Sequence, residues 1–281
     1  MAIKNFILTG DTHGRVSERL GNIARNMKIE DPSETAVIIL GDAGFNYWLN
    51  KTDDKEIRKA GEYGFLIYCV RGNHEERPEN LKYERAWDDN VQGEVYYDPI
   101  CDLIRYFVDG EAYNINGHRT LVIGGAYSVD KYYRLQRAAA AGQSFSGWFE
   151  DELLTKDEMQ KIEYLVMNRK FDFILTHTCP ISWEPTDLFL GCIDQTTVDK
   201  SMELWLDTIK DSVEWKYYLF GHFHADRIER PYVEQFYQDY EFLDEIVKRW
   251  ERYEKTGELD PWLIKSPNFN QGIQDKVVKS R

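Results

Sequence analysis

Five short segments of the sequence combine a glycine or threonine with side chains that can bind metal ions. The segments are residues 10–14 (GDTHG), 41–44 (GDAG), 72–75 (GNHE), 176–178 (THT) and 221–224 (GHFH). The chain has six histidines, and all except His118 lie in these segments. Carboxylate oxygens combined with imidazole nitrogens suit Mn, Fe or Zn, whereas Mg and Ca prefer shells of oxygen alone. The five segments therefore predict a transition-metal site.

The spacing within the segments suggests how they share the ions. Asp11 and His13 are two positions apart in one turn, and His222 and His224 are two apart in another, so that each pair can bind one ion. If the two pairs face different ions, the ions lie side by side, roughly 3.5–4 Å apart in such sites. One carboxylate must then bridge them. Asp42 is the candidate, because its turn contains no other type of ligand.

Each segment follows an apolar stretch that predicts a β-strand. These strands are expected at residues 5–9, 36–40, 65–70, 171–175 and 217–220, and helices at 16–27, 55–63, 156–168 and 198–209. Continuous apolar strands that alternate with helices predict a parallel sheet covered on both faces. Ligands collect at the carboxyl ends of the strands in such sheets. We therefore expect the five segments to share one crevice.

The remaining segments differ in character. Residues 94–97, 104–108, 111–115 and 119–126 predict an antiparallel portion with turns between the strands. Residues 128–147 predict a polar loop, in which Lys131, Arg134 and Arg137 either hold a substrate phosphate or are solvated surface charges. Residues 232–243 predict a strand, 245–255 a helix, and 257–281 an irregular tail.

Composition and charge narrow the classes of protein to which the chain could belong. The 281 residues carry a net charge of −14, which disfavours long polyanions as partners, although bound cations can reverse the field locally. The four cysteines form no C-x-x-C pair, which is typical of reduced thiols and predicts a cytoplasmic protein. The sequence contains neither a signal-peptide pattern nor an apolar run of about 18 residues, so no membrane association is expected.

The order of the motifs, D-x-H, G-D, G-N-H-E, a single His after a strand and G-H-x-H, resembles the calcineurin-like metallophosphoesterase family. The resemblance extends from Asp11 to His224. It implies an α/β (α+β) fold, a four-layer αββα sandwich of two mixed β-sheets with flanking helices. We accordingly expect a metallophosphoesterase domain at residues 1–243, with a C-terminal helix and tail at 244–281 packed on it or trailing from it.

The resemblance also implies a mechanism and a set of ligands. Two divalent ions, Mn²⁺ first and Fe or Zn as alternatives, hold a bridging hydroxide that attacks phosphorus in line and cleaves a phosphomonoester or phosphodiester. The first ion takes Asp11, His13 and His224, the second takes Asn73, His177 and His222, and Asp42 bridges them. His74 matches the family's non-ligand histidine, which stabilises the developing charge or protonates the leaving oxygen.

One position departs from the family pattern. The family often has G-D-x-x-D, in which the second Asp orients the His of G-N-H-E. Here that position is Phe45, so the sequence assigns no orienting partner to His74. The same segment lacks the Asp-Arg pair of the protein Ser/Thr phosphatase branch, which argues against phosphoprotein phosphatase activity.

Alternatives remain open at this level. The negative charge favours a small phosphorylated substrate, with nucleic-acid ends or cyclic nucleotides as alternatives, and the oligomeric state is not predicted. A catalytically inactive binding scaffold is the competing function, which the complete ligand set disfavours. We interpret His118 as an ordinary structural histidine and Cys179 as a small buried residue rather than a nucleophile.

Overall fold

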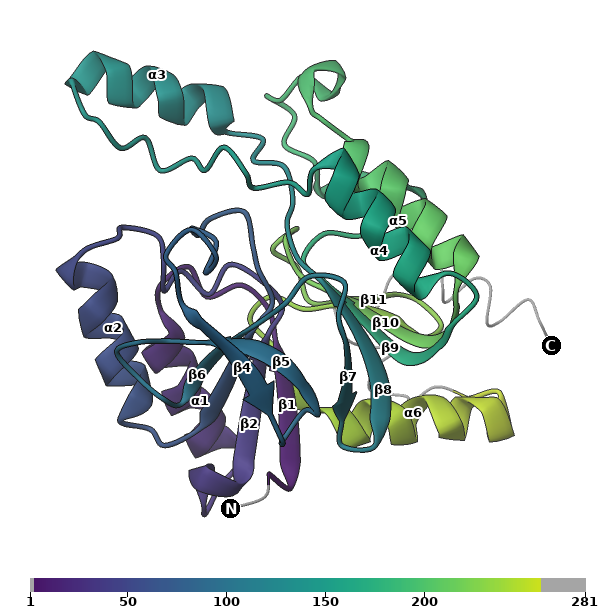
Figure 1. The fold of residues 1–281 in the computed structure, drawn as a ribbon. Helices are drawn as coiled ribbons and strands as arrows, with labels where there is room; N and C mark the ends of the chain where they lie inside the picture. Colours follow the sequence, from purple (N-terminus) through teal and green to yellow (C-terminus); the bar gives the residue numbers. More distant parts are fainter. Residues whose placement is uncertain (1–2, 259–281) are drawn as a thin grey trace.

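The computed structural model describes residues 3–258, which fold into four layers (Figure 1). Two β-sheets pack face to face, and α-helices cover their outer faces. Both sheets contain parallel and antiparallel strand pairs. The expected sandwich of two mixed sheets with flanking helices is confirmed.

The first sheet has seven strands in the order β13-β1-β2-β3-β6-β5-β4. Their bounds are β1 (Asn5–Thr9), β2 (Thr35–Ile39), β3 (Leu66–Cys69), β4 (Glu84–Asp88), β5 (Gly93–Tyr97), β6 (Ile104–Phe107) and β13 (Tyr240–Phe242). Strands β1, β2, β3 and β6 are parallel to one another, whereas β13 and β5 run antiparallel to their neighbours. β2 and β3 are buried throughout, as expected for parallel strands covered on both faces.

The second sheet has six strands in the order β11-β12-β10-β9-β8-β7. Their bounds are β7 (Ala112–Ile115), β8 (His118–Ile123), β9 (Lys170–Thr176), β10 (Glu214–Phe220), β11 (Arg227–Arg230) and β12 (Val233–Gln235). The four central strands are parallel, and both edge strands are antiparallel to their neighbours. The carboxyl ends of the central strands of both sheets therefore face the same end of the sandwich.

The outer layers are amphipathic helices. α1 (Val16–Asn26) and α2 (Lys51–Gly61) pack their apolar residues on the first sheet, and α4 (Lys156–Val166) and α5 (Ser201–Ser212) pack theirs on the second. Capping residues mark the beginning of two of these helices. The side chain of Asn50 caps α2, and Thr155 and Glu158 form a capping box at α4.

The C-terminal helix α6 (Leu243–Thr256) closes one end of the core between the sheets. Its Leu243, Ile246 and Trp250 are fully buried and belong to the same apolar cluster as Leu8 of β1 and Phe173 of β9. The division of the chain between residues 243 and 244 stays a prediction. The tail expected at residues 257–281 lies almost entirely outside the described residues. No helix in the described part of the chain is long and apolar enough to cross a membrane.

The structure corrects the prediction of a loop at residues 128–147. This segment contains helix α3 (Lys131–Ala141), which projects from the body of the molecule (Figure 1). Four successive alanines favour the helix, and Gly142 ends it in the left-handed conformation with φ +63°. Only Ala138 of α3 is buried, so the apolar periodicity that usually indicates a helix is weak.

Strands at the sheet edges were also missed. β4 (ERAWD) and β11 (RIER) are rich in charged residues and carry no continuous apolar run. The strand expected at residues 232–243 is divided into β12 and β13, which belong to different sheets. Edge strands need less apolar surface than central ones, which explains their weak signals.

Candidate metal centre

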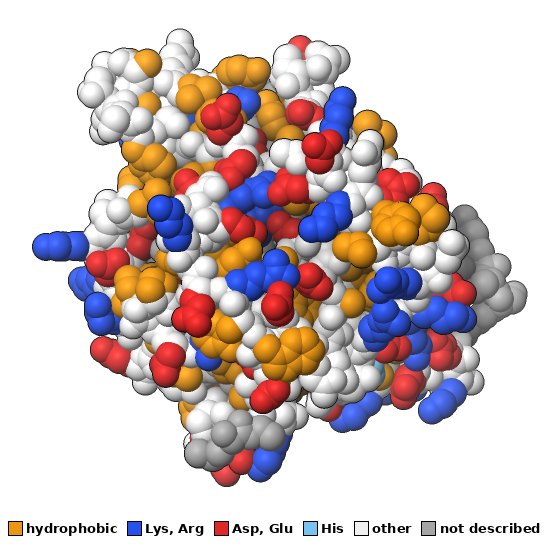
Figure 2. Space-filling view, viewed as in Figure 1, with side chains coloured by type: hydrophobic (Ala, Val, Ile, Leu, Met, Phe, Trp, Pro, Cys, Tyr) orange, Lys and Arg blue, Asp and Glu red, His pale blue; other side chains and the backbone are white. Residues whose placement is uncertain are grey.

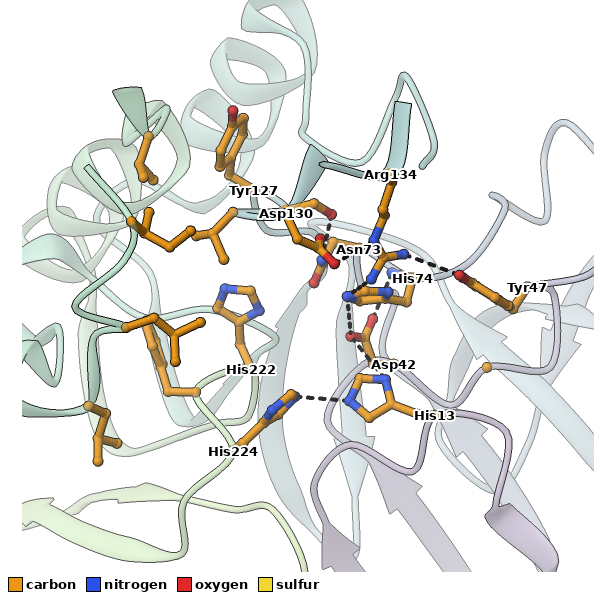
Figure 3. Close-up of a pocket in the computed structure, with 18 of the residues that line it drawn as sticks. His13, Asp42, Tyr47, Asn73, His74, Tyr127, Asp130, Arg134, His222 and His224 are labelled. Atoms are coloured by element: carbon orange, nitrogen blue, oxygen red, sulfur yellow. Dashed lines mark hydrogen bonds and ion pairs between the residues drawn. The ribbon is translucent and has the colours of Figure 1, made fainter. Parts of the chain in front are cut away.

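The predicted ligands converge where β1, β2, β3, β9 and β10 end. His13, Asp42, Asn73, His222 and His224 line a cavity of about 790 Å³ at this end of the sandwich (Figure 3). The two remaining ligands lie beneath its floor, since Asp11 is 1% exposed and His177 is fully buried. The shared crevice expected from the sequence is thus present.

Three overlapping groups of side chains bring possible ligand atoms within 4.8 Å of one another. The groups are Asp11, His13 and His224; His13, Asp42 and His74; and Asp11, Asp42 and His177. Asp42 belongs to two of them, as do Asp11 and His13. Its Oδ1 lies 3.5 Å from Nε2 of His177, and its Oδ2 lies 3.7 Å from Nδ1 of His13.

Two features show that this donor set fits a bound cation. Oδ2 of Asp11 is buried and makes no hydrogen bond, although Nε2 of His224 lies 3.3 Å away. A buried carboxylate oxygen without a partner is rare, and a metal ion would satisfy it. Nε2 of His13 and Nε2 of His224 approach to 2.9 Å. Nitrogen and carboxylate donors of this kind suit divalent transition metals.

Neighbouring groups orient His177 and Asn73. Nδ1 of His177 lies 2.9 Å from the carbonyl oxygen of Leu40, so Nδ1 carries a proton and Nε2 faces the centre. Nε2 in turn lies 2.9 Å from Oδ1 of Asn73. The Asn73 amide is held by its Nδ2, which donates to Ser128, whose hydroxyl donates to Glu152. Two acceptors that face each other require a proton or a cation between them.

The charge state of His177 depends on the two buried carboxylates beside it. Burial lowers its pKa, but Asp42 and Asp11 outweigh burial and raise it to about 9. The pKa of Asp42 is held well below its usual value despite burial, because His74 and His177 lie beside it. Without metal, the proton on His177 thus partly balances the buried carboxylates.

His222 lies beside the three groups rather than within them. Its backbone N–H donates to Oδ1 of Asp11 at 3.0 Å, and its ring centroid is 5.0 Å from that of His177. Burial and the neighbouring His177 lower the pKa of His222 to about 3, so its imidazole is neutral. A neutral imidazole is the form that binds metal.

The turns that carry the ligands have strained backbones. His13, Asp42, His222 and His224 have φ between 47° and 69°, in the left-handed region that residues other than glycine rarely adopt. Such conformations cost about 1–3 kcal/mol each and are concentrated at functional sites.

Steric constraints explain the glycines that precede the predicted ligands. A Cβ on Gly72 would lie 2.0 Å from Oδ1 of Asp42, and one on Gly41 would lie 2.0 Å from Nδ1 of His177. Each glycine therefore makes room for a ligand from a different strand, which explains the repeated glycine motif of the sequence.

His74 has a partner that the sequence did not identify. Its backbone N–H donates to Oδ1 of Asp42 at 2.8 Å, and its Nε2 lies 3.3 Å from Nη2 of Arg134. A guanidinium can only donate, so Nε2 of His74 accepts and the imidazole is neutral in this arrangement. Burial lowers the pKa of His74, and Arg134 lowers it further, although Asp42 opposes both. Phe45 is fully buried beneath α1 and α2 and is no partner of His74.

Of the three basic residues proposed as phosphate ligands, only Arg134 lines the cavity. Nζ of Lys131 lies over the ring of Trp148, 4.0 Å from its centroid, and Arg137 is exposed on α3. His118 lies at the start of β8 with its ring against Phe173.

Several supporting residues were missed. Glu75 is 3% exposed, and its carboxylate accepts from the backbone N–H of Gly72 and of Gly44, tying two ligand turns together. Burial, with Asp42 nearby, raises its pKa to about 7. Its place in the G-N-H-E motif was a usable signal. No local signal identifies Ser128 or Glu152, because Ser128 contacts Asn73, and Glu152 contacts Ser128, across long stretches of sequence.

The family model described as calcineurin-like phosphoesterase matches residues 4–226. No curated protein is similar enough to count as a match. The matched region covers most of the 281 residues and contains all the predicted ligands together with His74. The resemblance seen in the motifs is confirmed, and the chain belongs to the calcineurin-like phosphoesterase family.

Proposed function

We propose that the protein is a hydrolase that cleaves phosphoester bonds with two divalent metal ions. The observation that carries the proposal is the set of three overlapping groups of possible ligands, two of which contain Asp42, at the floor of an open cavity. Membership of the family supports metal-dependent phosphoester hydrolysis. The number of ions is inferred from the ligand arrangement, which is too large for a single ion.

The ligands divide into two sets around Asp42. Asp11, His13 and His224 would hold one ion, Asn73, His177 and His222 would hold the other, and Asp42 would contact both. When bound, the ions acidify a water for in-line attack on phosphorus and neutralise the phosphoryl oxygens. Nitrogen donors together with carboxylates favour Mn²⁺, with Fe or Zn as alternatives.

Arg134 positions the substrate phosphate in this scheme. Its Nε donates to Asp130 at 2.7 Å, which anchors the guanidinium at the cavity wall. Nη2 contacts His74 and can exchange this contact for a phosphoryl oxygen, because guanidinium groups bind phosphate strongly.

His74 acts on the leaving group once Arg134 has turned to the phosphate. Its Nε2 is then free to bind a proton, and the negative phosphate favours protonation. The imidazolium donates that proton to the leaving oxygen. The Asp42 contact to the backbone N–H of His74 keeps the ring at the cavity floor.

We further propose a reducing compartment, the cytoplasm, because all four cysteines are free. Burial raises the pKa of Cys179 well above its usual value, so its thiol is not a nucleophile at neutral pH.

Elemental analysis and hydrolysis assays test the proposal together. After loading with Mn²⁺ we expect about two ions per chain, and metal-dependent release of p-nitrophenol from p-nitrophenyl phosphate or its bis ester. Fewer than about one ion per chain, with no hydrolysis in the presence of Mn, Ni, Co or Zn, would instead support the inactive scaffold.

A further inference from the structure

The cavity extends to both sides of the metal centre, and an apolar wall rises on each side. Figure 3 shows His74 and Tyr47 on one side of the cavity and His222 on the other. In Figure 1, α3 and the segment before α5 project from the same end of the molecule, and Figure 2 shows hydrophobic side chains at that end between the two projections. The volume of about 790 Å³ lies within the range of cavities that enclose small organic ligands.

The first wall, which we call the Trp48 wall, consists of Tyr47, Trp48 and Val129. It begins at the centre itself, because the rings of Tyr47 and His74 are 6.2 Å apart. Trp48 packs edge-on against Tyr47, with centroids 4.8 Å apart, and remains 52% exposed. Its exposed part is an apolar surface of the same cavity that the predicted ligands line.

The second wall, the Phe189 wall, consists of Leu188, Phe189, Leu190, Ile193 and Phe223. It starts at His222, whose ring contacts Phe223 edge-on at 4.9 Å. Phe189 stacks on Phe223, and Leu190 is 61% exposed. Two separate apolar surfaces thus begin at two different histidines of the centre.

The charges in the cavity limit what the walls accept. Asp53 and Glu56 line it near the Trp48 wall, and Glu184 and Glu203 near the other. Nζ of Lys200 forms an ion pair with Glu184 at 2.6 Å and is therefore neutralised. Asp53 and Glu56 would repel a second phosphate at the Trp48 wall, and the paired Lys200 offers no free cation to one at the Phe189 wall. Groups bound by the walls must be uncharged.

We infer that the cavity binds a phosphodiester whose two uncharged, apolar or aromatic arms occupy the Trp48 wall and the Phe189 wall. The inference rests on the proposed function and names its substrate class. A monoester would cover one wall and leave the other exposed to water, whereas a diester covers both. Nucleic acids do not fit, since their arms carry further phosphates.

The reaction is then hydrolysis of one ester bond. An oxygen from water bonds to phosphorus, and the bond from phosphorus to one arm breaks. The proton lost by the water is balanced by the proton that the departing arm receives. The products are an alcohol or phenol and a monoester, which fills only one wall.

Substrates with one common leaving group test the inference. We would measure kcat/KM of the Mn²⁺-loaded protein for bis(p-nitrophenyl) phosphate, ethyl p-nitrophenyl phosphate and p-nitrophenyl phosphate. We expect the bis-aryl diester to be the best substrate and the monoester the worst. Trp48→Ala and Leu190→Ala should each lower the ratio of bis-aryl to ethyl diester by about three- to tenfold. Trp87 on β4 is similarly exposed but lies outside the cavity lining, so Trp87→Ala should leave the ratio unchanged.

Calorimetry of binding separates this inference from the proposed function. Dibenzyl phosphate carries less charge than benzyl phosphate, so a purely electrostatic site would prefer benzyl phosphate. We expect dibenzyl phosphate to bind more tightly. If benzyl phosphate binds more tightly and the monoester is hydrolysed best, the diester inference is wrong while the phosphoesterase function stands. If no ester is hydrolysed and neither ligand binds, both fail.

Discussion

Replacing Asp42 with asparagine removes a negative charge from the middle of the centre with little change in shape. The carboxylate lies 3.5–3.7 Å from ring nitrogens of His13, His74 and His177. Two unit charges 4 Å apart in a medium of effective dielectric constant about 20 interact by about 4 kcal/mol, close to a thousandfold in affinity. Relaxation and water reduce this value. We therefore expect Asp42→Asn to weaken Mn²⁺ binding by at least about a hundredfold.

Calorimetric titration of the metal-free protein with Mn²⁺ measures this loss, and hydrolysis of p-nitrophenyl esters follows its effect on activity. His118→Ala serves as a control, because its ring contacts Phe173 at the start of β8, away from the ligands. The control should keep both metal binding and activity. If Asp42→Asn binds two ions with normal affinity, or if His118→Ala is equally damaging, the assignment of the centre is wrong.

Three further predictions concern close packing, protonation and the C-terminal helix. Gly72→Ala places a Cβ 2.0 Å from Oδ1 of Asp42 and should abolish Mn²⁺ binding, whereas Gly191→Ala, with nothing within 4 Å, should not. In the metal-free protein the raised pKa of His177 stabilises the fold below pH 6.5, and this stabilisation is lost as the pH rises through about 9. Urea denaturation should show a loss of about 2 kcal/mol between pH 7 and 8.5. Trp250→Ala should lower the free energy of unfolding by about 3–5 kcal/mol, because the side chain is fully buried between the sheets.

For each of these three predictions, a specific result would contradict it. Normal Mn²⁺ affinity in Gly72→Ala would show that the turns can separate without loss of the centre. Stability of the metal-free protein that is constant or rises between pH 7 and 8.5 would contradict the raised pKa of His177. A change below about 1 kcal/mol in Trp250→Ala would show that α6 is dispensable and would favour a domain complete at residue 243.

The sequence was sufficient to predict the fold and the convergence of the ligands: the resemblance of its ordered motifs implied the sandwich, and local patterns predicted the shared crevice. The convergence depends on local patterns, since each predicted ligand follows an apolar strand and is separated from it by no more than three residues. Parallel strands then bring such residues to one end of the sheets whatever the connecting segments do. The glycines that precede most of the ligands are also a local signal that another part of the chain approaches the backbone closely. The clash that each one avoids is with a residue that follows a different strand.

Only the tertiary structure decided what surrounds the ligands. Arg134 reaches His74 across 60 residues of sequence, and Ser128 reaches Asn73 across 55. These contacts depend on the direction in which the segment containing α3 leaves the sheet, and no periodic sequence pattern predicts that direction. The two apolar walls also lie in segments without regular periodicity, so no sequence pattern predicts them. Contacts between distant parts of the chain have no local signal, so the grouping of the candidate ligands was predictable and the walls of the cavity were not.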